Sequence, residues 1–523
     1  MTKIETYDAT LRDGMQGEGM SLTAAEKVRV VHALDELGID LIEAGFPASN
    51  PKEQELFELL AKEQLKHATI AAFGMTRRRG VAAAEDPGLV VLAECFAPVT
   101  TIVGKTWAAH LEKIVKVSRE ENLEMISDSL TFLRERGKRA LYDAEHFFIA
   151  FRDDPGYALS CIRVAAEAGA ERVVLCDTNG SELPSQIADA VRSVREHFPD
   201  LALGIHCHND RECGVANTLA AVQEGVDHVQ GTMNGIGERT GNANLVSIIP
   251  TLELGLGYEL VGEERLRKLT PTARLVDEIL NRNPAPDQPW VGRSAFAHKG
   301  GLHVAGVRAD SALYEHNEPE VVGNKRALLV SELAGKHTVI EKAEEAGITL
   351  TDEQAQNVID RVKELEHQGY QYEAADASFE LLLRRESGDY RQLMTLESWR
   401  VIAEQGADGK CVTEATVKVV VDGERYVQTA EGNGPVNALD AALRAAIVQA
   451  HPHLADVELV NYKVRILDQA HGPGAITRAF IDASDGSSVW GSTGVGANVI
   501  AASWQALVDS LEYAEQPTPG AGG

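Results

Sequence analysis

The sequence predicts an α/β protein, with a (β/α)8 TIM barrel followed by helical linker subdomains and a C-terminal α+β regulatory domain. Two observations favour the barrel. Over residues 1–262, short apolar runs typical of buried strands alternate with amphipathic helical patterns. Polar residues also gather where most of these apolar runs end. An open, doubly wound sheet would give the same alternation, but eight strands with chemistry at their C-terminal ends favour a closed barrel.

The first helix of this region has clear start and stop signals. Thr23 and Glu26 have the spacing of a capping box, and an apolar stripe runs from Val28 to Leu37 before Gly38 ends the helix. Similar helical patterns occupy residues 158–168 and 183–197. The expected strands are residues 4–8, 39–44, 68–73, 100–103, 139–144, 172–176, 201–205 and 227–231.

Polar residues follow six of these strands. They are Asp13, Glu43, Glu145, the segment 177–180, the pair His206 and His208, and the glycine-rich segment 231–242. The active sites of such barrels lie at the C-terminal ends of the strands. The pattern therefore predicts one site assembled from distant parts of the sequence.

Two histidines and an aspartate in this set suggest a metal site. His206 and His208 are two residues apart on an expected strand, so their side chains share a face. With Asp13 they form a plausible ligand set for a divalent metal that leaves positions open for a substrate. Arg12 would place a fixed cation beside that metal. The combination suits a substrate that carries a carboxylate and a carbonyl side by side.

Composition narrows the range of partners. The chain has 523 residues and a net charge of −29, from 50 basic and 79 acidic residues. This charge argues against nucleic acid and anionic membrane surfaces. The six cysteines lack a Cys-x-x-Cys motif, which is typical of reduced thiols in a cytoplasmic protein. We expect no export signal and no membrane span, because no apolar run reaches about 18 residues.

The second half of the chain changes character twice. Residues 263–389 are predicted to be mostly helical linker subdomains, and residues 390–513 an α+β domain. In that domain a strand–strand–helix unit is expected twice, with helices near 436–450 and 497–513. A Gly-x-Gly precedes each helix, at Gly432 and Gly434 and at Gly494 and Gly496. Such helix starts can bind a carboxylate through backbone amides, or the glycines can simply turn the chain. Residues 514–523 are expected to form a disordered tail.

Three motifs together carry a family resemblance. They are Tyr-Asp-Ala-Thr-Leu-Arg-Asp-Gly-Met-Gln at 7–16, His-Cys-His at 206–208 and Gly-Glu-Arg-Thr-Gly-Asn at 237–242. The chain resembles the metal-dependent enzymes that condense an acyl-CoA with an α-keto acid, which include the isopropylmalate, homocitrate and citramalate synthases. Segments 16–19 and 44–51 are most similar to a citramalate synthase branch. The resemblance extends over essentially the whole chain.

The resemblance implies roles for the strand-end residues. Asp13, His206 and His208 match the ligands of a divalent metal (Mn²⁺, Mg²⁺ or Zn²⁺), with Asn242 as a further ligand or close neighbour. Arg12 matches the residue that holds the keto acid and stabilises charge on its carbonyl oxygen. The remaining matches are Thr178 for the substrate carboxylate, Glu145 near the acetyl group, and Gln16 and Glu43 as residues that orient Arg12 and the metal ligands.

The resemblance also extends to the later segments. His303 matches a catalytic base delivered into the barrel of a partner subunit of a homodimer, with Tyr314 near it. The glycines of residues 390–513 fall in the amino-acid-sensing domain of the family, and isoleucine is the implied effector.

The reaction that this implies is a Claisen condensation of acetyl-CoA with pyruvate, followed by thioester hydrolysis, in isoleucine biosynthesis. Another 2-oxo acid, as in isopropylmalate or homocitrate synthesis, is the first alternative. The barrel alone would also suit a metal-dependent aldolase or lyase, although residues 263–523 argue against it. An amino-acid sensor built on an inactive barrel is disfavoured by the intact Arg12, Asp13, His206 and His208.

Overall fold

The computed structural model describes residues 2–299, 301–328, 336–467 and 475–517. The chain forms two compact units: residues 1–296 with 317–326, and residues 297–316 with 327–523. Each unit has its own hydrophobic core and is described separately.

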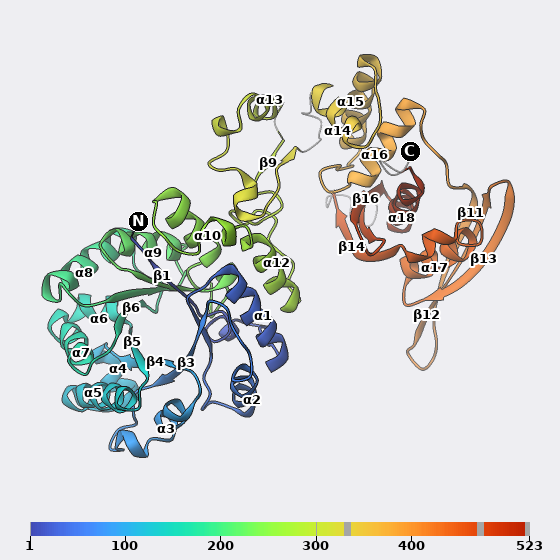
Figure 1. The fold of residues 1–523 in the computed structure, drawn as a ribbon. Helices are drawn as coiled ribbons and strands as arrows, with labels where there is room; N and C mark the ends of the chain where they lie inside the picture. Colours follow the sequence, from blue (N-terminus) through green and yellow to red (C-terminus); the bar gives the residue numbers. More distant parts are fainter. Residues whose placement is uncertain (1, 300, 329–335, 468–474, 518–523) are drawn as a thin grey trace. The chain divides into compact units, whose positions relative to one another are not determined.

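The first unit contains a closed barrel of eight parallel strands in sequence order (Figure 1). β1 pairs with both β2 and β8, which closes the sheet and rules out the open alternative. This confirms the predicted barrel. The strands are β1 (Glu5–Asp8), β2 (Leu41–Gly45), β3 (Thr69–Met75), β4 (Val99–Lys105), β5 (Arg139–Glu145), β6 (Arg172–Asp177), β7 (Leu203–Cys207) and β8 (His228–Gly231).

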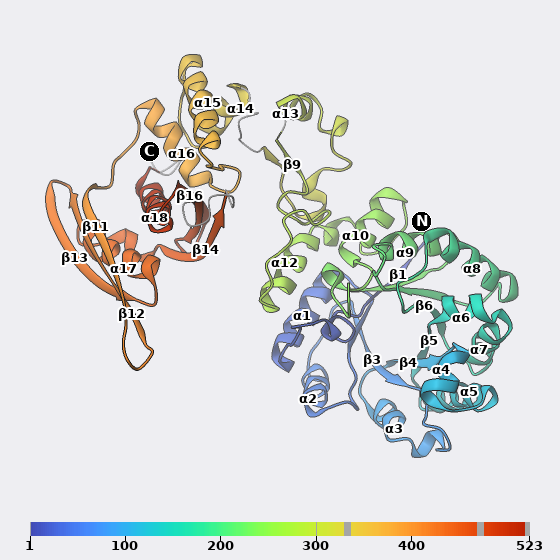
Figure 2. The same ribbon diagram turned by 180° about the vertical axis from the view of Figure 1, so that it is seen from behind.

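Helices surround the barrel and cover the outer faces of its strands, as Figure 2 shows from behind. In α1 the predicted capping box is present, and Gly38 ends the helix in the left-handed conformation at φ 92°. The helices of this unit are α1 (Ala24–Leu37), α2 (Pro51–Leu60), α3 (Pro87–Glu94), α4 (Ala108–His110), α5 (Arg119–Glu135), α6 (Phe147–Asp153), α7 (Pro155–Glu167), α8 (Pro184–His197), α9 (Gly214–Gln223), α10 (Leu245–Pro250), α11 (Glu263–Leu266) and α12 (Leu269–Ile279).

Apolar side chains fill the barrel interior beneath the strand ends. Tyr7, Leu41, Val99 and Leu141, all nearly inaccessible to solvent, form one cluster there. Close packing at this level separates the C-terminal mouth of the barrel, where the predicted site residues gather, from its opposite end.

The second unit begins with small elements. β9 (Ala297–His298) pairs in parallel with β10 (Ala327–Leu328). Its helices before the C-terminal domain are α13 (Gly301–Ala309), α14 (Lys336–Glu345), α15 (Asp352–His367) and α16 (Asp376–Ser387). This agrees with the helical character predicted for residues 263–389, although α11 and α12 belong to the barrel unit.

The C-terminal domain repeats a strand–strand–strand–helix unit. The expected unit had two strands before its first helix, and the structure corrects this to three. β11 was missed because most of its residues are exposed and only Trp399 and Val401 pack against the core of the domain. The elements are β11 (Thr395–Gln405), β12 (Cys411–Val421), β13 (Glu424–Gly432) and α17 (Pro435–Ile447), then β14 (Glu458–Ile466), β15 (Thr477–Ser484), β16 (Val489–Gly496) and α18 (Val499–Glu515).

α16 is bonded to this domain. The Ser378 hydroxyl donates to Asp509 of α18 at 2.7 Å, and the Gly491 amide of β16 donates to Asp376 at 2.8 Å. The domain thus includes residues before position 390. At the other end α18 extends to Glu515, so residues 514 and 515 of the predicted tail are helical, and residues 518–523 lie outside the described part of the chain.

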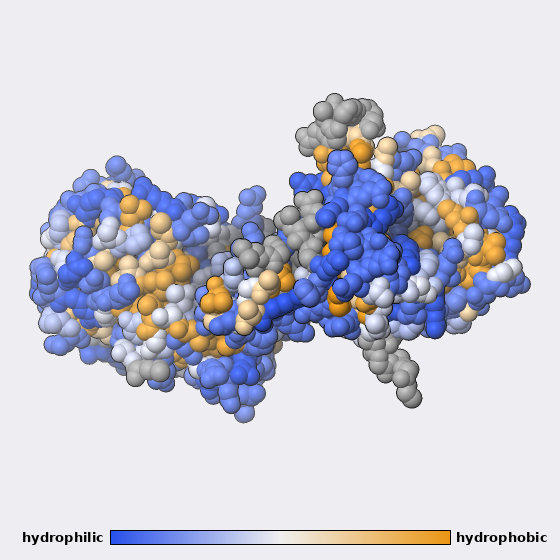
Figure 3. Space-filling view, turned by 90° about the horizontal axis from the view of Figure 1, so that it is seen from above, coloured by the Kyte–Doolittle hydropathy of each residue, from blue (hydrophilic) through white to orange (hydrophobic). Residues whose placement is uncertain are grey.

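Hydrophilic residues cover most of the face shown in Figure 3, and hydrophobic residues form scattered patches. Within the described residues, every helix is too short or too polar to cross a lipid bilayer.

Candidate active site

The strand ends of the barrel enclose a cavity of about 240 Å³. Its lining contains seven of the predicted site residues and is drawn from seven strands or the segments that follow them. The lining residues are Arg12, Asp13, Gln16, Phe73, Met75, Val103, Lys105, Asp143, Glu145, Cys176, Thr178, His206, His208 and Glu238.

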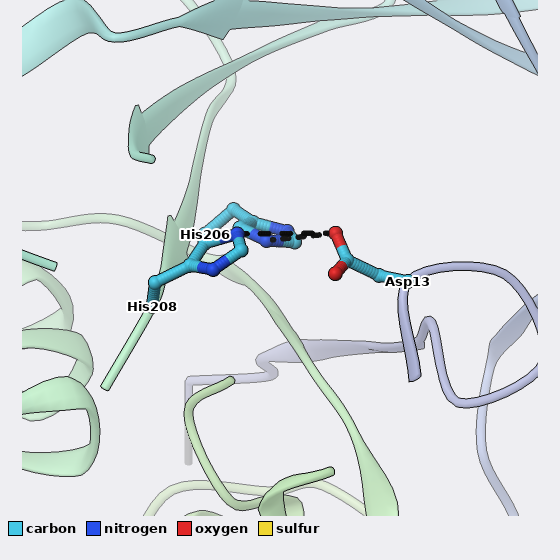
Figure 4. Close-up of side chains that lie close together, drawn as sticks. All are labelled: Asp13, His206 and His208. Carbon is cyan, nitrogen blue, oxygen red and sulfur yellow. Dashed lines mark ion pairs between the residues drawn. The ribbon is translucent and has the colours of Figure 1, made fainter. Parts of the chain in front are cut away.

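Asp13, His206 and His208 converge within this cavity (Figure 4). Oδ2 of Asp13 lies 3.6 Å from Nε2 of His206 and 3.9 Å from Nε2 of His208. Strand β7 ends at Cys207, so His208 stands just beyond it, in a backbone bridge to Asn242. Both rings still face Asp13, as their spacing predicted.

The donor atoms around Asp13 fit a divalent metal. Nδ1 of His206 lies 2.9 Å from Oε1 of Gln230, so Nδ1 carries the proton and Nε2 offers its lone pair. Nδ2 of Asn242 donates to Asp13 at 3.1 Å, while its Oδ1 is buried without a hydrogen-bond partner among the described residues. A buried, unpaired carbonyl oxygen beside a carboxylate is a suitable neighbour for a cation.

The charges support the same assignment. Burial alone would raise the pKa of Asp13, but the charge of Arg12 and a hydrogen bond from Asn242 help to hold it well below its ordinary value. Burial lowers the pKa of His208 to about 4, which keeps its ring neutral. Nδ1 of His208 lies 3.1 Å from Nη2 of Arg239. A ring that binds metal through Nε2 is protonated at Nδ1 and cannot accept from Arg239, whose Nη2 also donates to Asp210 at 2.9 Å.

Arg12 is held in a fixed orientation at the cavity wall. Its Nε donates to Glu43 at 2.6 Å, and Nη1 donates to Asp13 at 2.9 Å. The guanidinium carbon lies 3.9 Å from the centre of the Phe73 ring. The Tyr7 hydroxyl donates to the other oxygen of Glu43 at 2.8 Å. Glu43 is completely buried and bonds directly to Arg12, and its predicted role of orienting Arg12 stays a prediction.

Glu145 and Thr178 lie on the other side of the cavity. Glu145 forms an ion pair with Lys105, which ends the neighbouring strand β4. The hydroxyl of Thr178 accepts a hydrogen bond from the His146 amide at 2.8 Å. Gln16, in the short helix after Asp13, lines the cavity from an exposed position.

Sequence reasoning missed four polar residues of this site: Lys105, Asp143, Gln230 and Glu238. A signal existed for Asp143, because it precedes Glu145 by two residues and so shares its inward face. Burial, with a contribution from the charge of Glu43, raises the pKa of Asp143 to about 8. Gln230 follows the same rule on β8, two residues after the buried His228.

His303 and Tyr314 belong to the second unit. Their ring centres are 4.8 Å apart, and both residues are exposed. The Tyr314 ring lies against α13 at Gly306, where a Cβ atom would come within 2.0 Å of it. The pairing of these two side chains agrees with the prediction, and their catalytic role stays a prediction.

The four effector glycines do not share one environment. Gly434 begins α17 and lines a cavity of about 700 Å³. Gly494 instead packs against α18, where a Cβ would lie 2.0 Å from the Ala502 carbonyl oxygen. Gly432 packs in the same way against the start of α17. The amides at the start of α18 are capped by Asn498, next to Gly496.

Three family models match the chain in sequence order. Residues 3–276 match the HMGL-like family, residues 290–370 the homocitrate synthase post-HMGL domain-like family, and residues 373–515 the LeuA allosteric (dimerisation) domain. The first match covers more than half of the chain. The chain belongs to the HMGL-like family.

Curated relatives extend this likeness to nearly the full length. The chain is 46% identical to an (R)-citramalate synthase of Geobacter sulfurreducens, covering 98% of both chains. It is 48% identical to an (R)-citramalate synthase of Streptomyces coelicolor, covering 98% of this chain and 96% of the relative. Identity to the (R)-citramalate synthase of Aquifex aeolicus is 45%, over 98% of this chain and 97% of that one.

Proposed function

We propose that this member of the HMGL-like family is an (R)-citramalate synthase. It condenses acetyl-CoA with pyruvate and hydrolyses the resulting thioester to citramalate and CoA, in isoleucine biosynthesis. The observation that carries the proposal is the Asp13–His206–His208 cluster beside Arg12 in one cavity. Similarity to curated (R)-citramalate synthases over nearly the full length supports the choice of substrates.

Asp13, His206 and His208 would hold a divalent cation (Mn²⁺, Mg²⁺ or Zn²⁺), with Asn242 as a fourth ligand or close neighbour. Such a cation, when bound, polarises the keto group of the substrate as a Lewis acid. Gln230 would keep His206 in the tautomer that offers Nε2. Mixed oxygen and nitrogen donors suit all three ions.

Arg12 would stabilise the negative charge that develops on the keto oxygen during carbon–carbon bond formation. Two of its nitrogens are already bonded to Glu43 and Asp13, so the guanidinium needs little reorganisation when the charge appears. Thr178 would bind the carboxylate of pyruvate from the opposite wall, and Gln16 would contact it from the cavity mouth. Glu145 would lie near the acetyl group.

A second cavity offers room for the CoA portion of acetyl-CoA. It measures about 510 Å³ and shares Met75, Val103 and Lys105 with the reaction cavity. Its remaining lining combines apolar side chains with Arg78, Arg79 and Lys116. The apolar part suits the pantetheine arm and the cations suit the phosphates.

His303, assisted by Tyr314, would remove a proton from the acetyl methyl group. The match of residues 373–515 to a dimerisation domain supports a homodimer. In that dimer, we propose that His303 serves the barrel of the partner subunit.

The same domain would bind isoleucine as an inhibitor. The first amides of α17 have no side-chain cap, and they begin at the 700 Å³ cavity that Gly434 lines. Free amides at a helix start attract a carboxylate, and the apolar lining from Val457 and Leu459 suits a branched side chain.

The six free cysteines are consistent with a cytoplasmic enzyme.

The test is a panel of 2-oxo acids with acetyl-CoA and added metal, read by the release of free CoA thiol. We expect release with pyruvate to exceed that with 2-oxoisovalerate or 2-oxoglutarate at least tenfold in kcat/KM. A preference for either of the other acids would make the enzyme an isopropylmalate or homocitrate synthase. Thiol release without any 2-oxo acid would contradict a condensation.

A further inference from the structure

One charged side chain lines the boundary between the two cavities at the barrel mouth. The reaction cavity and the cavity proposed for CoA share three lining residues, which are Met75, Val103 and Lys105. Lys105 is the only one of the three that carries a charge. None of the steps assigned above uses its side chain.

The two-residue period of β4 directs Lys105 into the barrel mouth. Val99 belongs to the apolar cluster inside the barrel, and the hydroxyl of Thr101 lies 2.8 Å from that of the buried Tyr7. Side chains two apart on a strand share a face, so Val103 and Lys105 continue this inward row. Lys105 is the last residue of the strand, and its side chain therefore stands above the apolar interior, at the level of the cavities.

The backbone at Lys105 is fixed from outside the barrel. Its carbonyl oxygen accepts a hydrogen bond from Nδ2 of Asn122 at 2.8 Å. Asn122 is itself almost completely buried in α5, where the same Nδ2 donates to the Tyr157 hydroxyl at 2.9 Å. The end of β4 is thus tied to its covering helix, which limits how far the side chain can move from the cavity boundary.

Glu145 holds the ammonium group while leaving it able to bond further. Lys105 and Glu145 are partners in the register of β4 and β5, and their side chains form an ion pair. An ammonium has three N–H donors, and Glu145 is its one hydrogen-bond partner among the described residues. The Lys105 side chain is 20% exposed, so the charge lies mostly out of solvent. A fixed cation in such surroundings stabilises a developing anion more strongly than it would in water.

The proposed substrate positions bring the thioester to this boundary. With CoA in the second cavity and the keto acid beside Arg12 and Asp13, the acetyl group must lie where the two cavities meet. Its methyl carbon must come within about 3.5 Å of the keto carbon, and the thioester carbonyl is one bond further toward CoA. Arg12 lines the reaction cavity alone, whereas Lys105 lines both. The thioester oxygen therefore falls within reach of Lys105.

We propose that Lys105 is a further catalytic residue, whose ammonium stabilises the enolate oxygen that forms when acetyl-CoA loses a methyl proton. The inference rests on the proposed function, because this enolate arises only in an enzyme that activates acetyl-CoA as a nucleophile. Two fixed cations then serve the two oxygens that carry charge in turn. Lys105 serves the thioester oxygen, and Arg12 serves the keto oxygen.

The step balances without a further reactant. The base takes a proton from the methyl carbon, the electron pair of that C–H bond forms a carbon–carbon double bond, and the carbonyl electron pair moves to the thioester oxygen. Lys105 donates a hydrogen bond to this oxygen and keeps its proton. When the enolate carbon attacks the keto carbon, the thioester carbonyl re-forms and the negative charge passes to the keto oxygen beside Arg12. Lys105 forms no covalent bond at any point.

The experiment measures CoA release by the full-length, metal-loaded enzyme with acetyl-CoA and pyruvate. Values of kcat and KM are determined with ordinary acetyl-CoA and with acetyl-CoA that carries deuterium on the methyl group. The test variant is Lys105→Met, which keeps the length of the side chain and removes the charge. Lys62→Met, at an exposed position after α2, is the matched control.

We expect kcat to fall by about 100-fold or more in Lys105→Met, the usual effect of losing one preorganised donor to an oxyanion. The KM for pyruvate and the metal content should stay at wild-type values. Proton removal should limit turnover in this variant, so deuterium should slow it at least as much as it slows the wild type. Lys105→Arg, which keeps a cation, should retain more turnover than Lys105→Met, and the control should match the wild type.

Three results would overturn the inference. They are a kcat of Lys105→Met within about tenfold of wild type, a loss confined to the KM for acetyl-CoA, and a slow variant whose isotope effect is close to one. The second would make Lys105 a CoA-binding residue, and the third would place the loss in another step. If Lys105→Met does not fold, Lys105→Gln gives the same comparison, because its amide can still bond to Glu145 but carries no charge.

Failure of the proposed function has a different signature. It would show as wild-type enzyme that releases no CoA in response to pyruvate, whatever the variants do. If the wild type condensed acetyl-CoA with another 2-oxo acid instead, the same comparison of kcat and isotope effect would be made with that acid, and the role of Lys105 would stand or fall on it.

Discussion

At the scale of single residues, the site depends on how Arg12 and Asp13 restrain each other. They are neighbours in sequence and form an ion pair at 2.9 Å, while Glu43 fixes the opposite edge of the guanidinium. The charge of Arg12 also helps to keep Asp13 ionised in spite of its burial. A single buried arrangement thus provides a carboxylate that could bind a metal and a fixed cation beside it.

Arg12→Lys should lower turnover by about 100-fold or more, because lysine keeps the charge but cannot bond two carboxylates through a planar fork. Metal content should stay at the wild-type level, since Asp13 and both histidines remain. Steady-state kinetics and metal analysis check this, with Arg192→Lys on the exposed face of α8 as control. If Arg12→Lys kept more than about a tenth of wild-type turnover, Arg12 would have only a structural role, as an ion-pair residue at the barrel mouth.

Gln230→Met should weaken metal binding by roughly 10- to 100-fold, the usual effect of losing the partner that orients a histidine ligand. Methionine keeps the volume but removes the acceptor that fixes the tautomer of His206. Metal titration of the stripped enzyme measures the affinity. Gln54→Met, at an exposed position of α2, should bind metal as the wild type does. Equal affinity in the two variants would show that His206 needs no fixed tautomer.

The sequence predicted Asp13, His206 and His208 because two regular rules sufficed, the two-residue period of a strand and the gathering of strand ends. It did not predict the pairing of Arg239 with His208, because that contact joins a loop to a strand end across 31 residues. It also missed Lys105, whose strand end carries no motif. Contacts made by loops depend on tertiary structure that no local pattern encodes.

At the scale of elements, the barrel is tied together at its base as well as at its mouth. Glu5 of β1 lies 2.8 Å from Nδ1 of His228 on β8, and it also contacts Arg172 of β6 and Arg139 of β5. Burial would raise the pKa of Glu5, but the hydrogen bond from His228 and the two arginine charges lower it to about 2. Four strands thus share one carboxylate at the end opposite the active site.

Glu5→Gln should lower the stability of the barrel at neutral pH by on the order of 2 kcal/mol, because a folded pKa below the unfolded value stabilises the ionised form. That contribution is present above pH about 4.5 and is lost as pH falls toward 2. The wild type should therefore lose stability over this range more steeply than the variant. Denaturant unfolding from pH 7 to pH 3 measures the difference.

Glu36→Gln provides the comparison for this experiment, since Glu36 makes an exposed ion pair with Lys268 and should contribute little. Parallel pH profiles for the wild type and Glu5→Gln would contradict the linkage.

The helices and strands of the barrel unit were readily predicted, because each buried face left a period in the sequence. β11 left only a weak one, because Trp399 and Val401 are the residues of this strand that pack against the core.

At the scale of the whole molecule, the residues proposed for catalysis and the proposed effector domain occupy different parts of the chain. Every residue proposed for catalysis or metal binding precedes position 315, whereas the dimerisation-domain match begins at residue 373. The sequence placed the start of the regulatory domain at residue 390, and that boundary stays a prediction. The hydrogen bonds from α16 to β16 and α18 favour an earlier division.

Truncation after Tyr372 should therefore yield a soluble protein that keeps measurable condensation but ignores isoleucine. Truncation after Tyr390 would leave the buried face of α16 without α18, and we expect that protein to aggregate. Size-exclusion chromatography and CoA-release assays with and without isoleucine compare the two. Isoleucine inhibition that survived removal of residues 373–523 would move the effector site into the remaining chain.

The central claim is that Asp13, His206 and His208 hold the metal for a condensation of acetyl-CoA with pyruvate. The most direct measurement is pyruvate-dependent CoA release by stripped enzyme as metal is added back, in the wild type and in Asp13→Ala. We predict that release by the wild type rises with bound metal to one equivalent per subunit, while Asp13→Ala binds far less and stays inactive. Full activity of Asp13→Ala with stoichiometric metal, or wild-type activity that is independent of metal, would contradict the account.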